Sequence, residues 1–232
     1  MDKVQYFALA LPVLLFSMVA HEYAHGYAAL KQGDPTAYQL GRLTWNPLKH
    51  IDFFMTLVLP IVTFVSSNGT VIFGGAKPVP VVPRNFRNFK RGDIIVSLAG
   101  VATNLVLAVV CTALATTLGM IGQAIPSLAT LLSILQVMMI LGIQVNLILA
   151  FFNLLPIPPL DGSHVMKYLL PPAWSLRYQQ LGAYGILLLF VLFATDFGRP
   201  LFTRWMWPAF TLYDIAVNVV SPFRLPISWM VV

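Results

Sequence analysis

The chain has 232 residues and is rich in apolar side chains: 58% of the residues are hydrophobic, only 9% are charged, and the mean hydropathy is +0.80. A soluble domain typically carries about 25% charged residues, so this composition excludes an ordinary soluble enzyme and indicates an integral membrane protein. The net charge of +6 fits the excess of Lys and Arg on the cytoplasmic loops of membrane proteins, and we therefore expect no nucleic-acid partner. The single cysteine, Cys111, excludes an intrachain disulfide framework and a cysteine-rich metal site.

The first predicted element is a helix over residues 4–30, which ends at the stop signals Gly33 and Pro35. Residues 4–20 contain one strongly polar side chain, that of Gln5, so the segment is apolar enough to enter a bilayer. No small-x-small cleavage site precedes residue 21. We therefore expect this segment to be retained as the first membrane span rather than removed as a signal peptide.

An H-E-x-x-H motif lies near the end of this helix, as His21-Glu22-Tyr23-Ala24-His25. Histidines four residues apart share one face of a helix, where both rings can reach a single zinc ion. The intervening glutamate can serve as general base to a zinc-bound water. Ionisable residues are costly in an apolar span and indicate a function there. The motif therefore predicts a hydrolytic zinc site close to one membrane face.

The next segments do not resemble a second full span. Residues 34–50 form a loop, and residues 51–66 are apolar but interrupted by Pro60. After a turn signal at 67–69, residues 70–83 combine β-branched residues with prolines and cannot form a helix. This pattern predicts an extended segment or a hairpin that dips into the bilayer and returns, which is allowed where protein or water covers the backbone.

Two long spans follow, at residues 94–120 and 128–155, and a fourth and a weaker fifth are predicted at 181–195 and 205–220. The sequence thus predicts an all-α polytopic membrane protein with about five to six transmembrane helices. A re-entrant extended or β element is expected between the first two core spans.

We expect one integral-membrane domain over residues 1–232. Its core is predicted at residues 1–170, followed by C-terminal helices at residues 177–222.

The distribution of basic residues gives an orientation. If the residue 51–82 segment returns to the face from which it entered, all basic residues except Lys3, Arg199 and Arg204 lie on the face that carries the histidines. That face is therefore predicted to be cytoplasmic. The same topology brings Asp161 to the depth of His25.

A hydrolytic zinc bound by two histidines needs a third protein ligand and an open position for water. The remaining histidines are His50 and His164, and among the acidic residues Asp161 stands out. It follows Pro156, Pro158 and Pro159, which unwind the end of the preceding helix and let a carboxylate turn inward.

Three motifs in order carry a resemblance to a known family. They are H-E-Y-A-H, G-G-A-K-P-V-P-V and F-N-L-L-P-I-P-P-L-D-G. Together they resemble the site-2 protease family of intramembrane zinc metalloproteases, in its small bacterial branch without a PDZ domain. The resemblance covers residues 1–170.

This resemblance implies a set of site residues. His21, His25 and Asp161 would bind one Zn²⁺ per chain, and Glu22 would be the catalytic base. Asn153 would hold the substrate or the developing oxyanion, since a fixed amide donor stabilises that charge. Asn104 matches another common family position, and for it and Asn146 we expect hydrogen bonds between helices.

The extended segment is predicted to bind substrate. An unwound part of a transmembrane substrate could add to its edge as a β-strand, with prolines limiting pairing to one side. The predicted substrate-binding residues are Gly74, Gly75, Lys77, Val79, Val81 and Asn153.

The resemblance also implies a location and partners. We expect a multi-pass protein of the bacterial plasma membrane with the active site near the cytoplasmic face, the N-terminus outside and the C-terminus inside. Its partners would be the lipid bilayer and a transmembrane protein or peptide substrate.

Two other functions remain open at this point: a membrane zinc-binding or transport protein, and an inactive protease-like protein that binds membrane helices. A transporter needs ligands at several depths along a path. An inactive binding protein would tolerate replacement of Glu22.

Overall fold

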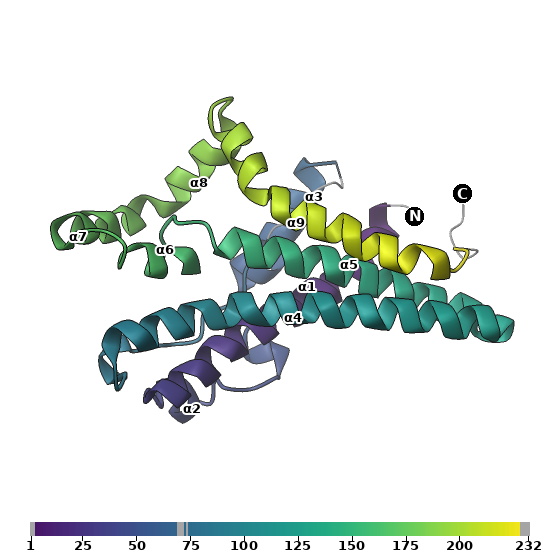
Figure 1. Cartoon of the computed structure of the whole chain (residues 1–232), viewed down its shortest axis with the longest axis horizontal. Coiled ribbons are helices and arrows are strands. Elements are labelled where there is room, and N and C mark those ends of the chain that lie inside the picture. Colours follow the sequence, from purple (N-terminus) through teal and green to yellow (C-terminus); the bar gives the residue numbers. More distant parts are fainter. Residues whose placement is uncertain (1–2, 69–71, 73, 228–232) are drawn as a thin grey trace.

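The computed structural model describes residues 3–68, 72 and 74–227, and within these residues the chain is helical and contains no strand. Three long helices form the centre of the bundle: α1 (Lys3–Gln32), α4 (Phe89–Ala124) and α5 (Ala129–Asn153). The helices α4 and α5 run side by side and are joined by the short turn η4 (Pro126–Leu128), so they are antiparallel (Figure 1).

The main apolar core lies where α9 (Gly198–Val220) covers the α4–α5 pair (Figure 1). Small side chains on α4 allow close approach of the helices, as is usual in membrane bundles. The fully packed members of this core are Ala108, Ala115, Ile143, Leu147, Met206, Ala209 and Val220.

Shorter elements connect and flank these helices. They are α2 (Thr36–Gln39), η1 (Pro47–Lys49), η2 (Phe53–Val58), α3 (Leu59–Ser66), η3 (Pro83–Asn85), α6 (Asp161–Met166), α7 (Pro172–Gln180), η5 (Leu181–Tyr184), α8 (Gly185–Ala194) and η6 (Ser221–Phe223).

By length and composition, three of the described helices could cross a membrane: α1, α4, and the helix that continues from η4 into α5. A fourth candidate exists only if the segment before and within α8 counts as one broken span, because it bends by 81°. A continuous span was expected at 181–195, yet α8 has only ten residues, which at about 1.5 Å each cover half of a bilayer core. The predicted number of five to six spans therefore remains a prediction.

The predicted re-entrant region forms a hairpin whose two halves, called here the outgoing and the returning limb, differ in structure. The outgoing limb is helical, through η2 and α3, and too short to cross about 30 Å of hydrocarbon. The returning limb is the irregular segment 74–82, whose Lys77 N–H donates to the His50 carbonyl at 2.8 Å. The hairpin thus begins and ends at one level of the molecule, as a re-entrant element would.

Of the two predicted alternatives, extended or β, the described part of this hairpin shows no strand pairing. Its prolines supply no N–H donors. The N–H groups of Gly75 and Lys77 donate to the carbonyls of Met55 and His50, and those of Val79 and Val82 donate to the side chains of Glu22 and Asp34. The described residues 72 and 74–82 are therefore a non-helical segment rather than a β element, while Thr70, at the start of the predicted segment, lies outside the described residues.

The C-terminal segment packs at the end of the bundle where α4 meets α5. The Gln123 side chain at the end of α4 donates to the Pro222 carbonyl, and the Leu225 N–H donates to Gln136 on α5. The start of α1 lies at this same end of the bundle (Figure 1). The two ends of the described chain therefore lie together, because α9 has 23 residues and returns along α5. This arrangement does not support the expected placement of the N-terminus outside and the C-terminus inside, which stays a prediction.

Candidate metal centre

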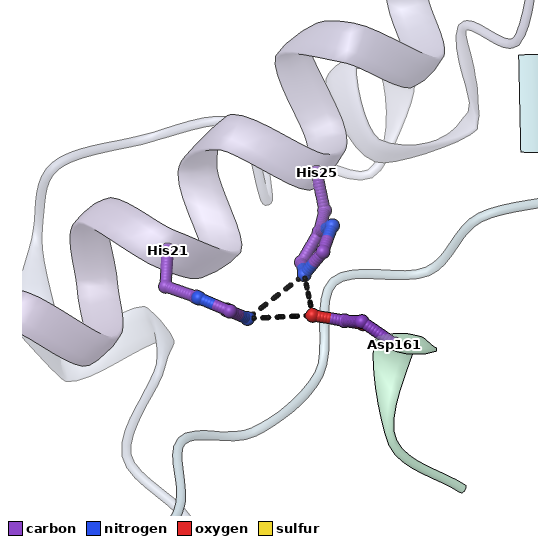
Figure 2. Close-up of side chains that lie close together, drawn as sticks. All are labelled: His21, His25 and Asp161. Atoms are coloured by element: carbon purple, nitrogen blue, oxygen red, sulfur yellow. Dashed lines mark hydrogen bonds and ion pairs between the residues drawn. The ribbon is translucent and has the colours of Figure 1, made fainter. Parts of the chain in front are cut away.

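Three side chains from two distant segments converge beside α1. Figure 2 shows His21 and His25 projecting from one face of that helix toward Asp161, the first residue of α6. The two Nε2 atoms are 3.0 Å apart, and Asp161 Oδ2 lies 3.2 Å and 3.3 Å from them. These are the ligand atoms of the one three-residue group within the described residues that could hold a metal ion.

Partners on α4 fix the protonation of both imidazoles. His25 Nδ1 lies 2.7 Å from the Val96 carbonyl, which only accepts, so Nδ1 carries the proton. His21 Nδ1 lies 2.5 Å from Asn104 Oδ1, and the Asn104 amide is oriented by donating to Asn146 at 2.7 Å. Each neutral ring therefore presents an Nε2 lone pair to the centre, as metal-binding histidines do.

The centre consequently contains acceptors without donors. Two Nε2 lone pairs and a carboxylate oxygen face one another, and Asp161 Oδ2 is buried without a hydrogen-bond donor. Such a group of acceptors repels unless a cation lies among them. Nitrogen and oxygen donors in a His₂-carboxylate set suit zinc and leave a coordination position open. The residues present thus fit a catalytic zinc ion.

A glycine on α4 makes room for the imidazoles. A Cβ atom on Gly100 would lie 2.5 Å from His21 Cε1 and 2.6 Å from His25 Nε2. Any side chain there would occupy the space of the rings.

Glu22 contacts the returning limb of the hairpin. Its Oε2 accepts a 2.7 Å hydrogen bond from the Val79 N–H. The Val79 side chain is buried and packs near Gly26, one turn further along α1. The segment predicted to bind substrate therefore contacts the residue predicted to act as base.

The other predicted substrate residues mostly contact the rest of this hairpin. Gly74 lies against Pro60, and Gly75 exchanges hydrogen bonds with the Met55 carbonyl and the Thr56 hydroxyl. Val81 packs against the small core cluster of Ala29, Phe86 and Val96. Along one edge, the N–H groups of Gly75, Lys77 and Val79 are already bonded within the chain.

Asn153 ends α5 and is not joined to the centre. Its side-chain N–H donates to the Leu149 carbonyl of its own helix at 2.9 Å. No hydrogen bond from it to His21, His25 or Asp161 is present in the part of the chain that the structure describes.

Sequence reasoning left part of the site unidentified. Asn104 was expected only to bridge helices; it does contact Asn146, and it also orients His21. Val96 orients His25 through its backbone carbonyl, and because every residue has such a carbonyl, the sequence does not identify this contact. A usable signal was present, since Val96, Gly100 and Asn104 recur at intervals of four residues and so share one face of α4.

Two histidines on an apolar helix and an aspartate from α6 could together hold a metal ion, and a glutamate lies beside the histidines. This arrangement is typical of metal-dependent hydrolases, here on a helix long and apolar enough to cross a membrane. The model of peptidase family M50 matches residues 7–193. The chain therefore belongs to peptidase family M50, which confirms the resemblance carried by the three motifs.

Similar proteins have been named in bacteria. The chain is 37% identical over 213 residues to "Putative zinc metalloprotease YwhC" of Bacillus subtilis, with 90% of each chain covered. It is 32% identical over 208 residues to "Putative zinc metalloprotease Rip2" of Mycolicibacterium smegmatis, covering 89% of this chain and 73% of the relative. No solved structure matches the chain.

Proposed function

We propose that this zinc metalloprotease of the M50 type hydrolyses peptide bonds in or near the transmembrane segments of membrane proteins. His21, His25 and Asp161 would hold the zinc ion, and Glu22 would move the proton. The observation that carries the proposal is the convergence of two Nε2 lone pairs and one carboxylate oxygen, with both Nδ1 atoms already committed to partners on α4.

The proposed reaction divides between the zinc ion and Glu22. Zinc in such a site polarises a peptide carbonyl and lowers the pKa of water toward neutrality. Glu22 would accept the proton of the attacking water and deliver it to the leaving amine. The Val79 N–H would hold one Glu22 oxygen, which leaves the other free for proton transfer.

Substrate would enter along the returning limb of the hairpin. A peptide bond in a transmembrane helix is shielded by helical hydrogen bonds, so the substrate must unwind before it is cleaved. The edge formed by Gly75, Lys77 and Val79 is bonded within this chain, and the opposite edge contains Pro78 and Pro80, which lack N–H groups. An unwound substrate would therefore donate its own N–H groups to carbonyls of this limb. Asn153 would turn its second amide hydrogen toward the oxyanion.

We further propose that the metal centre faces the cytoplasmic side of the bacterial plasma membrane. The basic residues near the site, on the loops around α2 and η3, support this orientation. The start of α1 would then lie outside.

Cleavage by the purified protein tests the function. Zinc-loaded wild type, Glu22→Gln and Asp161→Ala proteins would be incubated with a panel of single-span peptides in detergent or liposomes, and zinc would be quantified in each. We expect cleavage by wild type, loss of cleavage with retained zinc in Glu22→Gln, and loss of both in Asp161→Ala. Full cleavage by Glu22→Gln would contradict the proposed base, and zinc transport without cleavage would favour a transporter.

A further inference from the structure

A second polar cluster lies between α4 and α6, outside the metal centre. Asp93 on α4 is buried, and its carboxylate contacts three side chains that follow Asp161. These contacts are to His164 Nδ1 at 3.1 Å, Lys167 Nζ at 2.5 Å and the Tyr168 hydroxyl at 2.8 Å. We call Asp93, His164, Lys167 and Tyr168 the α6 clasp.

The helix α6 needs such an anchor. It has six residues and no side-chain cap at its N-terminus, and helices this short are unstable on their own. Its start packs tightly against the residue that follows α5, because a Cβ on Gly162 would lie 2.1 Å from the Leu154 carbonyl oxygen. That contact fixes where α6 begins, but a single point leaves the rotation of the helix free.

The clasp supplies the second point of attachment. His164 lies three residues after Asp161, so the two side chains share one face of α6, while Lys167 and Tyr168 follow directly after that helix. Asp93 lies three residues before Val96, on the same face of α4 that orients the two histidines. One face of α4 therefore contacts both the segment that carries the histidines and the segment that carries the aspartate.

We infer that Asp93 is a positioning residue for the metal centre: through His164, Lys167 and Tyr168 it sets the rotation of α6 and so aims the Asp161 carboxylate at the two imidazoles. The inference rests on the proposed role of Asp161 as a metal ligand. Residues that orient metal ligands typically change metal affinity by about 10–100-fold when replaced.

Zinc affinity tests this role without relying on activity. Affinity would be measured by competition with a zinc chelator in the full-length protein, together with thermal unfolding of the zinc-free form. We expect Asp93→Asn to weaken zinc binding by about 10–100-fold. The matched control is Asp196→Asn, the same chemical change at a fully exposed aspartate paired with Arg199, for which we expect wild-type affinity.

A double variant separates positioning from folding. In Asp93→Asn the Lys167 ammonium, only 13% exposed, loses its carboxylate partner, whereas Asp93→Asn/Lys167→Gln leaves two amides that can bond to each other. The double variant should recover most of the lost affinity, a rescue that general damage to the fold would not give. Should Asp93→Asn fail to fold, Tyr168→Phe removes one clasp hydrogen bond without stranding a charge and should weaken zinc binding by a few-fold.

The outcomes also separate this inference from the proposed function. Wild-type zinc affinity in folded Asp93→Asn, with weakened binding in Asp161→Ala, would overturn the role of Asp93 alone. Wild-type affinity in Asp161→Ala would overturn both the ligand assignment and the clasp that depends on it. Equal losses in the single and double variants would also overturn the positioning role.

Discussion

At the scale of single residues, the site is defined by which atoms are left without donors. The Val96 carbonyl and the Asn104 side-chain oxygen accept hydrogen bonds from Nδ1 of His25 and His21, which leaves both Nε2 atoms available as ligands. The H-E-x-x-H spacing makes the histidines visible in the sequence because a helix brings residues four apart together. The protonation of the rings is not visible there, because it depends on a backbone carbonyl and an amide from another helix.

Replacing Asn104 by leucine should weaken zinc binding by about 10–100-fold, because His21 loses the partner that fixes its tautomer. The loss would be measured by chelator competition. Asn218→Leu, the same change at an exposed position on α9, should keep wild-type affinity. Equal affinities in the two variants would show that Asn104 does not orient the ligand.

Gly100→Ala should separate stability from zinc binding. Alanine favours a helix interior over glycine by about 0.5–1 kcal/mol, yet its Cβ would enter the space of both imidazoles. We expect zinc content and cleavage to fall at least tenfold. Gly182→Ala, whose Cβ would meet only Pro158 at an ordinary 3.5 Å, should leave both unchanged. Normal zinc content in Gly100→Ala would mean that the rings do not occupy the space seen here.

At the scale of elements, the returning limb is attached to α1 at two carboxylates. Glu22 accepts from Val79, and Asp34, just beyond α1, accepts from Val82 and Asn85. The sequence predicted a non-helical segment here from its prolines and β-branched residues, and that part is confirmed. The β alternative is not seen in the described residues, because the N–H groups of Val79 and Val82 bond to side-chain acceptors on α1 and its end instead of to a strand.

Proline substitutions at Val79 and Val81 should have different effects on catalysis. Val79→Pro removes the N–H that holds Glu22, whereas the Val81 N–H makes no hydrogen bond among the described residues. We expect Val79→Pro to lower kcat of peptide cleavage at least tenfold with zinc retained, and Val81→Pro to have a smaller effect. Equal effects of the two substitutions on kcat would contradict a role of the Val79 amide in holding the base.

The attachment at Asp34 should depend on pH. Burial alone would raise the pKa of Asp34, but the hydrogen bonds from Thr36, Val82 and Asn85 outweigh it and lower the pKa below its ordinary value. The stabilisation is therefore complete above the unfolded pKa of about 3.9 and is lost as pH falls through the folded pKa. Amide-exchange protection of residues 82–85 should hold between pH 7 and 5 and fall below about pH 4. In Asp34→Ala it should be low throughout.

At the scale of the whole molecule, the apolar composition and the three long helices were predictable, because each long span is a continuous apolar run. The last helix was predicted at residues 205–220, which lie within α9, but the arrangement of the last helices was not predictable. The expected fourth span bends between α7 and α8, and α9 carries Arg199, Arg204 and Asp214 yet packs along α5 through Met206 and Ala209. Hydropathy does not detect a helix that is held by packing against its neighbours.

Cysteine labelling can test the resulting topology. In a Cys111→Ala background, Ser127→Cys and Arg224→Cys should react with a membrane-impermeant reagent from the same side, because η4 and η6 lie at one end of the bundle. Lys90→Cys, near the metal centre, should react only from the other side. Labelling of Arg224→Cys together with Lys90→Cys would contradict this topology and support termini on opposite faces.

The coordination of the zinc ion tests the central claim most directly. X-ray absorption at the zinc edge of the loaded wild-type protein should give two imidazole nitrogens at about 2.0–2.1 Å and oxygen donors at about 2.0–2.2 Å. Asp161→Ala should lose a carboxylate oxygen and bind zinc more weakly. An unchanged zinc spectrum in Asp161→Ala, or a sulfur donor from Cys111 at about 2.3 Å, would contradict a centre built from His21, His25 and Asp161.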